Sequence, residues 1–133
     1  MPYSMRELTD VEKETFLTEN HWGTLSFTGD EVYAIPMGYQ YEKGTVLLGF
    51  QPRGRKMDYI NKNRNVCFNV CRPAKQTIDS KEAYPYTSVI IEGELEEYDR
   101  SQYGLEPLPE GVKLGLYRIK PKRVGTQKMD FTP

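Results

Sequence analysis

Segments with the alternating pattern of half-buried β-strands recur along the chain, whereas helix-like patterns are few and short. Alternation of polar and apolar residues places successive side chains on opposite faces of a sheet. A doubly wound α/β sheet needs a helix at every crossover between parallel strands, and two short helices cannot supply them. We therefore predict a mostly β fold, in which six antiparallel strands close into a small barrel. The expected strands span residues 23–28, 32–41, 45–50, 66–71, 87–98 and 113–120.

Two helices are expected between these strands. Thr9 and Glu12 have the spacing of a capping box, and the apolar residues behind them predict a helix over 10–19. A second helix of one to two turns is expected over 57–62.

Proline and glycine predict where regular structure is interrupted. Pro36 has no N–H to donate to a ladder, so it marks an edge, a bulge or a bend within 32–41. Residues 73–85 are polar and 99–111 contain two prolines and two glycines, so both segments are expected to be irregular. The basic tail after residue 120 is expected to be partly extended.

Composition restricts the class of protein. Eighteen basic and nineteen acidic residues leave a formal net charge of -1, which argues against a dedicated nucleic-acid binder. No apolar run approaches the ~20 residues that span a bilayer, and the N-terminus lacks the apolar stretch of a secretory signal. We expect one domain over residues 1–133, located in the cytoplasm, with no membrane or nucleic-acid partner.

The two cysteines fall within one expected strand. Cys67 and Cys71 are four residues apart, so their side chains share a face about 13 Å apart, too far for a disulfide. Val66, Phe68 and Val70 alternate with them and are expected to face the core. Reduced, packed thiols are therefore predicted rather than a disulfide or a metal site.

A cationic, glycine-containing loop precedes the second helix. A helix N-terminus offers unpaired N–H groups and the positive end of the dipole, which suits an anion. Gly54 allows a ligand to approach the backbone, and Arg55 and Lys56 add two charges. The segment is a candidate phosphate site, and a solvated basic turn is the alternative.

Side chains that usually carry catalysis are scarce. There is no Walker P-loop, no GxGxxG after a first strand and no GxSxG elbow. The single histidine, His21, is expected to be a packed or capping residue, and Glu92, Glu94 and Glu96 alternate as one solvated strand face would. This pattern fits a protein whose cofactor carries the chemistry while the fold orients it.

Several short motifs follow one another at suitable spacing. They are Gly23-Thr-Leu-Ser, Ala34-Ile-Pro-Met-Gly-Tyr with Tyr41, Val46-Leu-Leu-Gly-Phe, Gly54-Arg-Lys, Asn65-Val-Cys-Phe and Ser88-Val-Ile-Ile-Glu-Gly. In this order they resemble the pyridoxamine 5′-phosphate oxidase-like flavin-binding split barrels, most closely the branch related to 5-nitroimidazole resistance proteins. The resemblance covers roughly residues 5 to 98.

The resemblance implies a homodimer of six-stranded split barrels that binds FMN in two clefts at the subunit interface. By position, the backbone of Gly54 with Arg55 and Lys56 would hold the FMN phosphate. The remaining implied contacts are Met37, Gly38 and Tyr39 along the isoalloxazine ring, Gly49, Phe50 and Gln51 along the ribityl chain, and Ser88 and Val89 on the strand that meets the partner's flavin. Arg118 and Lys128 are candidates for the cation near the N1–C2 oxygen edge.

Two departures from the family pattern matter. Many nitroimidazole-type relatives carry a histidine where this chain has Gly49 or Phe50, so nitro-group reduction does not follow from the resemblance. A long helix that often follows the Gly93 strand is replaced by the breaker-rich residues 99–111.

Three functions remain open. The first is an FMN-dependent oxidoreductase that passes electrons from a reduced nicotinamide or another small donor to a small acceptor, with no catalytic side chain assigned. The second is a non-catalytic flavin carrier, or a haem-related relative of the same barrel. The third is an OB-like barrel that binds single-stranded nucleic acid through Tyr39, Tyr41 and the basic loop.

Overall fold

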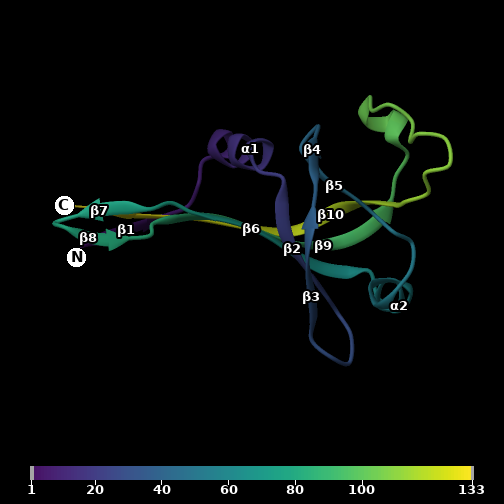
Figure 1. Ribbon diagram of the computed structural model, residues 1–133, viewed down its shortest axis with the longest axis horizontal. Helices are drawn as coiled ribbons and strands as arrows, with labels where there is room; N and C mark the ends of the chain where they lie inside the picture. The colour runs from purple at the N-terminus through teal and green to yellow at the C-terminus, as the bar shows by residue number, and fades with distance from the viewer. Residues whose placement is uncertain (1, 133) are drawn as a thin grey trace.

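The computed structural model describes residues 2–132 and shows an antiparallel split barrel (Figure 1). Its main sheet has eight strands in the order β3-β2-β6-β9-β10-β5-β4, with β1 paired to β10. The sheet does not close, since β3 and β4, the first and last strands of this order, do not pair with each other. The elements are β1 (Tyr3–Arg6), α1 (Asp10–Glu19), β2 (Trp22–Phe27), β3 (Tyr33–Gly38), β4 (Gln40–Glu42), β5 (Thr45–Phe50), α2 (Arg55–Lys62), β6 (Asn65–Pro73), β7 (Gln76–Ile78), β8 (Lys81–Ala83), β9 (Tyr86–Glu97), the 3-10 helix η1 (Arg100–Tyr103) and β10 (Gly115–Phe131).

The core follows from the alternation in the sequence. On β6 the side chains of Val66, Phe68 and Val70 are buried, as predicted, while Cys67 is half-buried and Cys71 is exposed. Successive residues of a strand face opposite sides of the sheet, so one apolar set fills the barrel. Both thiols are free, but the exposed Cys71 contradicts the expectation that both are packed.

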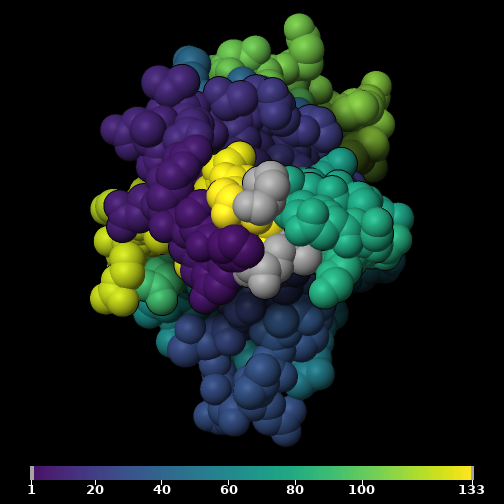
Figure 2. Space-filling model, turned by 90° about the vertical axis from the view of Figure 1, so that its left-hand side faces the viewer, coloured from purple at the N-terminus to yellow at the C-terminus, as the bar shows by residue number. Residues whose placement is uncertain are grey.

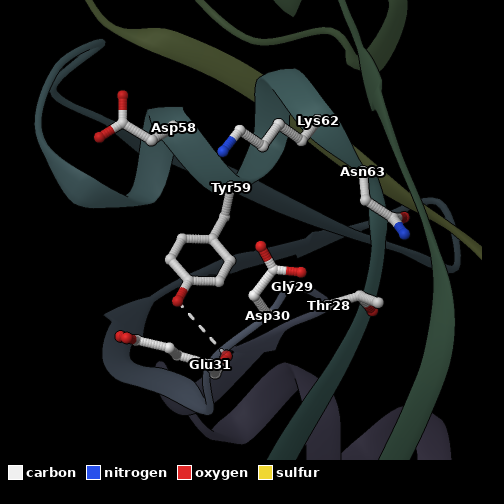
Figure 3. Close-up of a pocket in the computed structure, with 8 residues that line it drawn as sticks. All are labelled: Thr28, Gly29, Asp30, Glu31, Asp58, Tyr59, Lys62 and Asn63. Carbon is white, nitrogen blue, oxygen red and sulfur yellow. Dashed lines mark hydrogen bonds between the residues drawn. The ribbon is translucent and has the colours of Figure 1, made fainter.

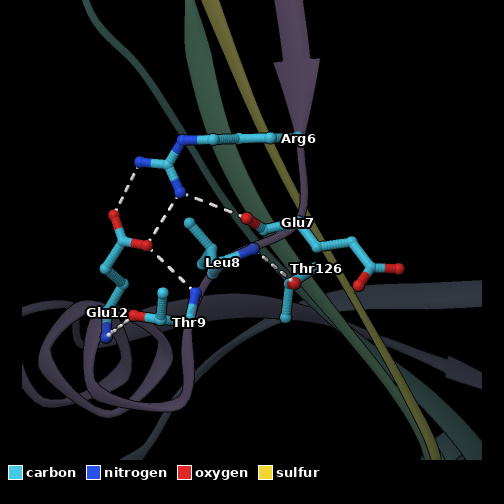
Figure 4. Close-up of polar contacts among 6 residues, drawn as sticks. All are labelled: Arg6, Glu7, Leu8, Thr9, Glu12 and Thr126. Carbon is cyan, nitrogen blue, oxygen red and sulfur yellow. Dashed lines mark hydrogen bonds and ion pairs between the residues drawn. The ribbon is translucent and has the colours of Figure 1, made fainter.

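The first helix begins as predicted. Thr9 accepts a hydrogen bond from the Glu12 N–H, and the Glu12 carboxylate accepts one from the Thr9 N–H. Arg6 donates two further bonds to the same carboxylate, at 2.8 and 2.7 Å, and the Leu8 N–H donates to Thr126 Oγ1 at 2.9 Å (Figure 4). These bonds tie β1, the start of α1 and β10 together.

Pro36 lies on an edge strand. The predicted strand 32–41 is divided into β3 and β4, and Pro36 pairs with Thr24 on β2. The missing N–H is tolerated because β3 has a neighbour on one side only. At the break, the Tyr39 N–H leaves the ladder and donates to the His21 carbonyl at 2.9 Å.

The last strand is much longer than predicted. β10 continues to Phe131 instead of ending near residue 120, because its second half pairs with β9 and then with β1. A register shift between Pro121 and Arg123 lets the ladder pass the proline, which lacks a donor. Periodicity within one segment does not reveal such partners.

The segment 73–85 was expected to be irregular, but it contains the β7–β8 hairpin. Asp79 and Ser80 form its turn with φ values of 50° and 65°, a conformation that non-glycine residues rarely adopt. This hairpin, β1 and the end of β10 gather at one end of the molecule (Figure 2). Within residues 2–132, no helix is long and apolar enough to cross a membrane.

Candidate functional site

The glycine-containing loop leads directly into α2, which begins at Arg55 rather than at residue 57. Gly54 is the N-cap residue with a φ of 92°, a left-handed conformation that favours glycine. The Lys56 ammonium donates to the Arg53 carbonyl at 3.1 Å and lies 5.8 Å from the ring centroid of Phe50. Three residues of the predicted site, Gly54, Lys56 and Phe50, are therefore brought together at the start of an eight-residue helix.

Arg55 has different partners from Lys56. Its Nη2 atom lies 3.0 Å from Glu31 Oε2 and 3.4 Å from the Tyr59 hydroxyl oxygen. The guanidinium carbon also lies 4.5 Å from the centroid of the Tyr33 ring. Arg55 thus contacts the loop between β2 and β3, whereas Lys56 contacts the end of β5 and the Arg53 carbonyl.

A groove of about 380 Å³ contains three more predicted residues: Gly38, Tyr39 and Gly49. Two glycines line it without side chains; a Cβ atom at Gly49 would lie 3.4 Å from the Leu116 side chain and one at Gly38 would lie 3.7 Å from Trp22, both ordinary contact distances. Larger side chains would project into the space that these glycines leave. The groove therefore suits a flat ring that approaches the backbone closely.

The groove residues that were not predicted from the sequence include one exposed aromatic side chain and one cation. Trp22, the chain's one tryptophan, is 69% exposed there, and Arg100 of η1 lines the same space. An exposed tryptophan at the start of an expected strand was an available signal for Trp22. Arg100 lies in a segment expected to be irregular, and only tertiary structure brings it to the groove.

The side chain of Tyr39 belongs to the core. It is 5% exposed, packs edge-on against Phe68 with centroids 5.4 Å apart, and donates from its hydroxyl to the Leu17 carbonyl at 2.8 Å. Burial raises the pKa of Tyr39 to about 12, above that of an ordinary phenol. Met37, also buried, packs in the same core.

The other predicted residues are spread over both faces of the sheet. Phe50 stacks on Tyr117 with centroids 5.3 Å apart, and Gln51 is exposed. Val89 is fully buried in the core, while Ser88, also buried, lies on the opposite face beside Cys71. The structure does not bring Ser88 or Val89 to the groove of the same chain.

The two late cations proposed from the sequence do not line the groove. Arg118 lies 3.7 Å from Glu96 and donates to the Tyr103 hydroxyl at 3.1 Å. Lys128 is paired with Thr87 near the far end of β10. Among residues 2–132, the cation that lines this groove is Arg100.

Other polar residues have structural surroundings. His21 is exposed, so the prediction of a packed residue was wrong. Its backbone carbonyl accepts the hydrogen bond from the Tyr39 N–H. The expected solvated face of β9 is confirmed, with Glu92, Glu94 and Glu96 in ion pairs across to β10. In the described part of the chain, no group of three or more His, Cys, Asp or Glu residues could hold a metal ion.

A second cavity of about 410 Å³ lies between the β2–β3 loop and α2 (Figure 3). The loop contributes Gly29, Asp30 and Glu31, and the helix contributes Asp58 and Tyr59 among others. The sequence did not predict this cavity, because its two walls are separated along the chain.

Solved structures share this fold at low sequence identity. A candidate 5-nitroimidazole antibiotic resistance protein from Bacteroides thetaiotaomicron has a TM-score of 0.74 at 14% identity, over 97% of this chain and 90% of that chain. A FAD-binding protein from Mesorhizobium loti has a TM-score of 0.71 at 18% identity, over 98% and 100%. A FAD and heme binding protein from Mycobacterium smegmatis has a TM-score of 0.69 at 10% identity, over 93% and 72%.

Similarity at the sequence level comes from a family model. No curated protein matches the chain significantly. The family model described as pyridoxamine 5′-phosphate oxidase matches residues 9–113, which include α1, α2 and the strands from β2 to β9. The chain belongs to the pyridoxamine 5′-phosphate oxidase family.

Proposed function

We propose that this protein is a homodimeric oxidoreductase that binds FMN. The observation that carries the proposal is the end of β5, where Gly49 lines the groove and the next residue, Phe50, lies beside Lys56. The groove and the cationic helix start thus lie at adjacent positions of β5, although Gly49 is exposed and Phe50 is buried on the opposite face of the strand. Solved relatives described as binding FAD, or FAD and heme, support a flavin as the ligand.

FMN fits these residues because it carries one terminal phosphate and one planar ring. Arg55, Lys56 and the N–H groups at the start of α2 would meet the phosphate. Gly38 and Gly49 would admit the ring, and Leu116 and Trp22 would shield it from water. When bound, FMN supplies hydride and electron transfer. Arg100 would place positive charge beside the ring.

We further propose that a second copy of the chain covers the groove. Strand register aligns Pro36, Thr24, Asn69 and Ile90 in an uncharged row across β3, β2, β6 and β9, on the face opposite the core. Trp22 lies on the same face of β2 as Thr24, and Ile90 is 42% exposed. A dimer formed through this face would extend over the groove through Trp22. Obligate interfaces of this kind bury more than ~2,000 Å².

A carrier without turnover is the second candidate. It is favoured by the absence of an acid–base pair such as His with a carboxylate among the described residues that line the groove. A solved structure of the same fold, described as that of a FAD and heme binding protein, supports this candidate.

Flavin titrations test the proposed ligand. The apoprotein is expected to bind FMN more tightly than riboflavin, because riboflavin lacks the phosphate. Light scattering of the complex is expected to give twice the chain mass of 15.4 kDa. Equal affinity for both flavins, or a monomer that retains FMN, would contradict the proposal.

Anaerobic addition of a reduced nicotinamide separates the two candidates. Bleaching of the bound flavin indicates an oxidoreductase, and absence of bleaching indicates a carrier.

A further inference from the structure

The Arg55 guanidinium is already bound to a carboxylate. Its Nη2 atom lies 3.0 Å from Glu31 Oε2, and this ion pair joins α2 to the loop between β2 and β3. The side chains are 51% and 78% exposed, so both remain accessible to solvent and to a ligand. Arg55 is also one of the two cations implied for the phosphate, so Glu31 and a phosphate would share the same group.

Packing holds Glu31 in this place independently of the ion pair. The Tyr59 hydroxyl donates to the Glu31 carbonyl at 3.3 Å (Figure 3). The Tyr33 and Tyr59 rings stack with centroids 5.0 Å apart. Gly29 lies directly against the Tyr59 ring, since a Cβ atom there would come within 2.3 Å of it. The loop is therefore packed against α2, which keeps the Glu31 backbone near Arg55.

We propose that Glu31 limits the affinity of the site for a phosphorylated flavin by competing for Arg55. The inference rests on the proposed FMN site. Binding of a phosphate dianion through Arg55 requires the guanidinium to loosen its bond to Glu31 or to share it, and it brings two anions close together. Among residues 2–132, Lys56 has no such competitor, because its partners there are a backbone carbonyl and an aromatic ring. Glu31 thereby lowers the preference of the site for FMN over riboflavin.

Removal of the Glu31 charge tests this role. Glu31→Gln keeps the side-chain shape and is expected to tighten FMN binding about two- to fivefold, the range of an exposed ion pair, with riboflavin affinity unchanged. Asp30→Asn is the matched control, because Asp30 is the adjacent acidic residue of the same loop and lines the same cavity. Arg55→Met combined with Glu31→Gln is expected to abolish the gain.

The outcomes separate the two proposals. Unchanged or weaker FMN binding by Glu31→Gln, or an equal gain from Asp30→Asn, would overturn the role of Glu31 and leave the FMN site standing. A gain that persists in the Arg55→Met background would overturn it as well, because the effect would not pass through Arg55. Equal affinity of the wild type for FMN and riboflavin would refute the phosphate site itself, and the role of Glu31 with it.

Discussion

The Tyr39 hydroxyl donates a 2.8 Å hydrogen bond to the Leu17 carbonyl and so joins the link between β3 and β4 to the last turn of α1. That carbonyl belongs to the end of the helix, where backbone acceptors lack intrahelical donors. Tyr39 thus satisfies a buried acceptor from its side chain while its backbone borders the groove.

Tyr39→Phe is expected to lower the free energy of unfolding by about 1 kcal/mol, because the Leu17 carbonyl loses its donor. Urea unfolding followed by circular dichroism measures the change. Tyr41→Phe is the control, since the Tyr41 hydroxyl donates to Glu14 at an exposed position and its loss is expected to change stability by less than about 0.5 kcal/mol. Equal losses in the two variants would contradict the structural role of Tyr39.

Lys56→Gln is expected to weaken FMN binding about ten- to a hundredfold, because a charge-assisted hydrogen bond contributes roughly 1.5–3 kcal/mol. Arg55→Ala is expected to weaken it less, since Glu31 already shares the guanidinium. Lys62→Gln removes the same charge at the other end of α2 and serves as the control. Fluorescence titration measures all three, and a loss in Lys62→Gln as large as that in Lys56→Gln would argue against a local phosphate site.

Gly49→Val is expected to abolish or strongly weaken flavin binding without loss of thermal stability. The glycine lies in a strand, where valine is favoured, and the nearest side-chain atoms allow a Cβ at ordinary contact distance. The added methyl groups would occupy the groove instead. Thermal unfolding and flavin titration of one preparation decide the matter, and full flavin affinity in this variant would place the ring elsewhere.

The ion pair between Arg6 and Glu12 predicts a loss of stability in acid. The hydrogen bonds from Arg6 lower the pKa of Glu12 from 4.5 to about 2 in the folded protein. The folded pKa is depressed, so the stabilising effect is complete above pH 4.5 and is lost as the pH falls toward 2.

Thermal unfolding from pH 6 to pH 2 tests this dependence. The difference in melting temperature between the wild type and Glu12→Gln is expected to shrink as the pH falls. Glu7→Gln, a neighbouring exposed carboxylate change, is the control and is expected to follow the wild type. A constant difference across the range would show that the carboxylate charge does not contribute.

Local patterns in the sequence determined most of the secondary structure. Alternating residues predicted the core face of β6, and the spacing of Thr9 and Glu12 predicted the start of α1. The short motifs around Gly38, Gly49 and Gly54 indicated the family. Glycine allows a ligand to approach the backbone closely, and the residues on either side of each glycine make its motif recognisable in the sequence. These features depend on residues close together in the chain.

Tertiary structure alone decided the features that depend on distant partners. β10 extends to Phe131 because β9 and β1 supply its hydrogen bonds, and periodicity within residues 121–131 carries no record of them. Arg100 lines the groove, and Arg55 pairs with Glu31 instead of lying beside Lys56. Contacts with distant residues determine these side-chain directions, and the local sequence does not favour one direction over another. Packing and charge pairing between segments that are distant in sequence determine these directions, so only the folded structure shows them.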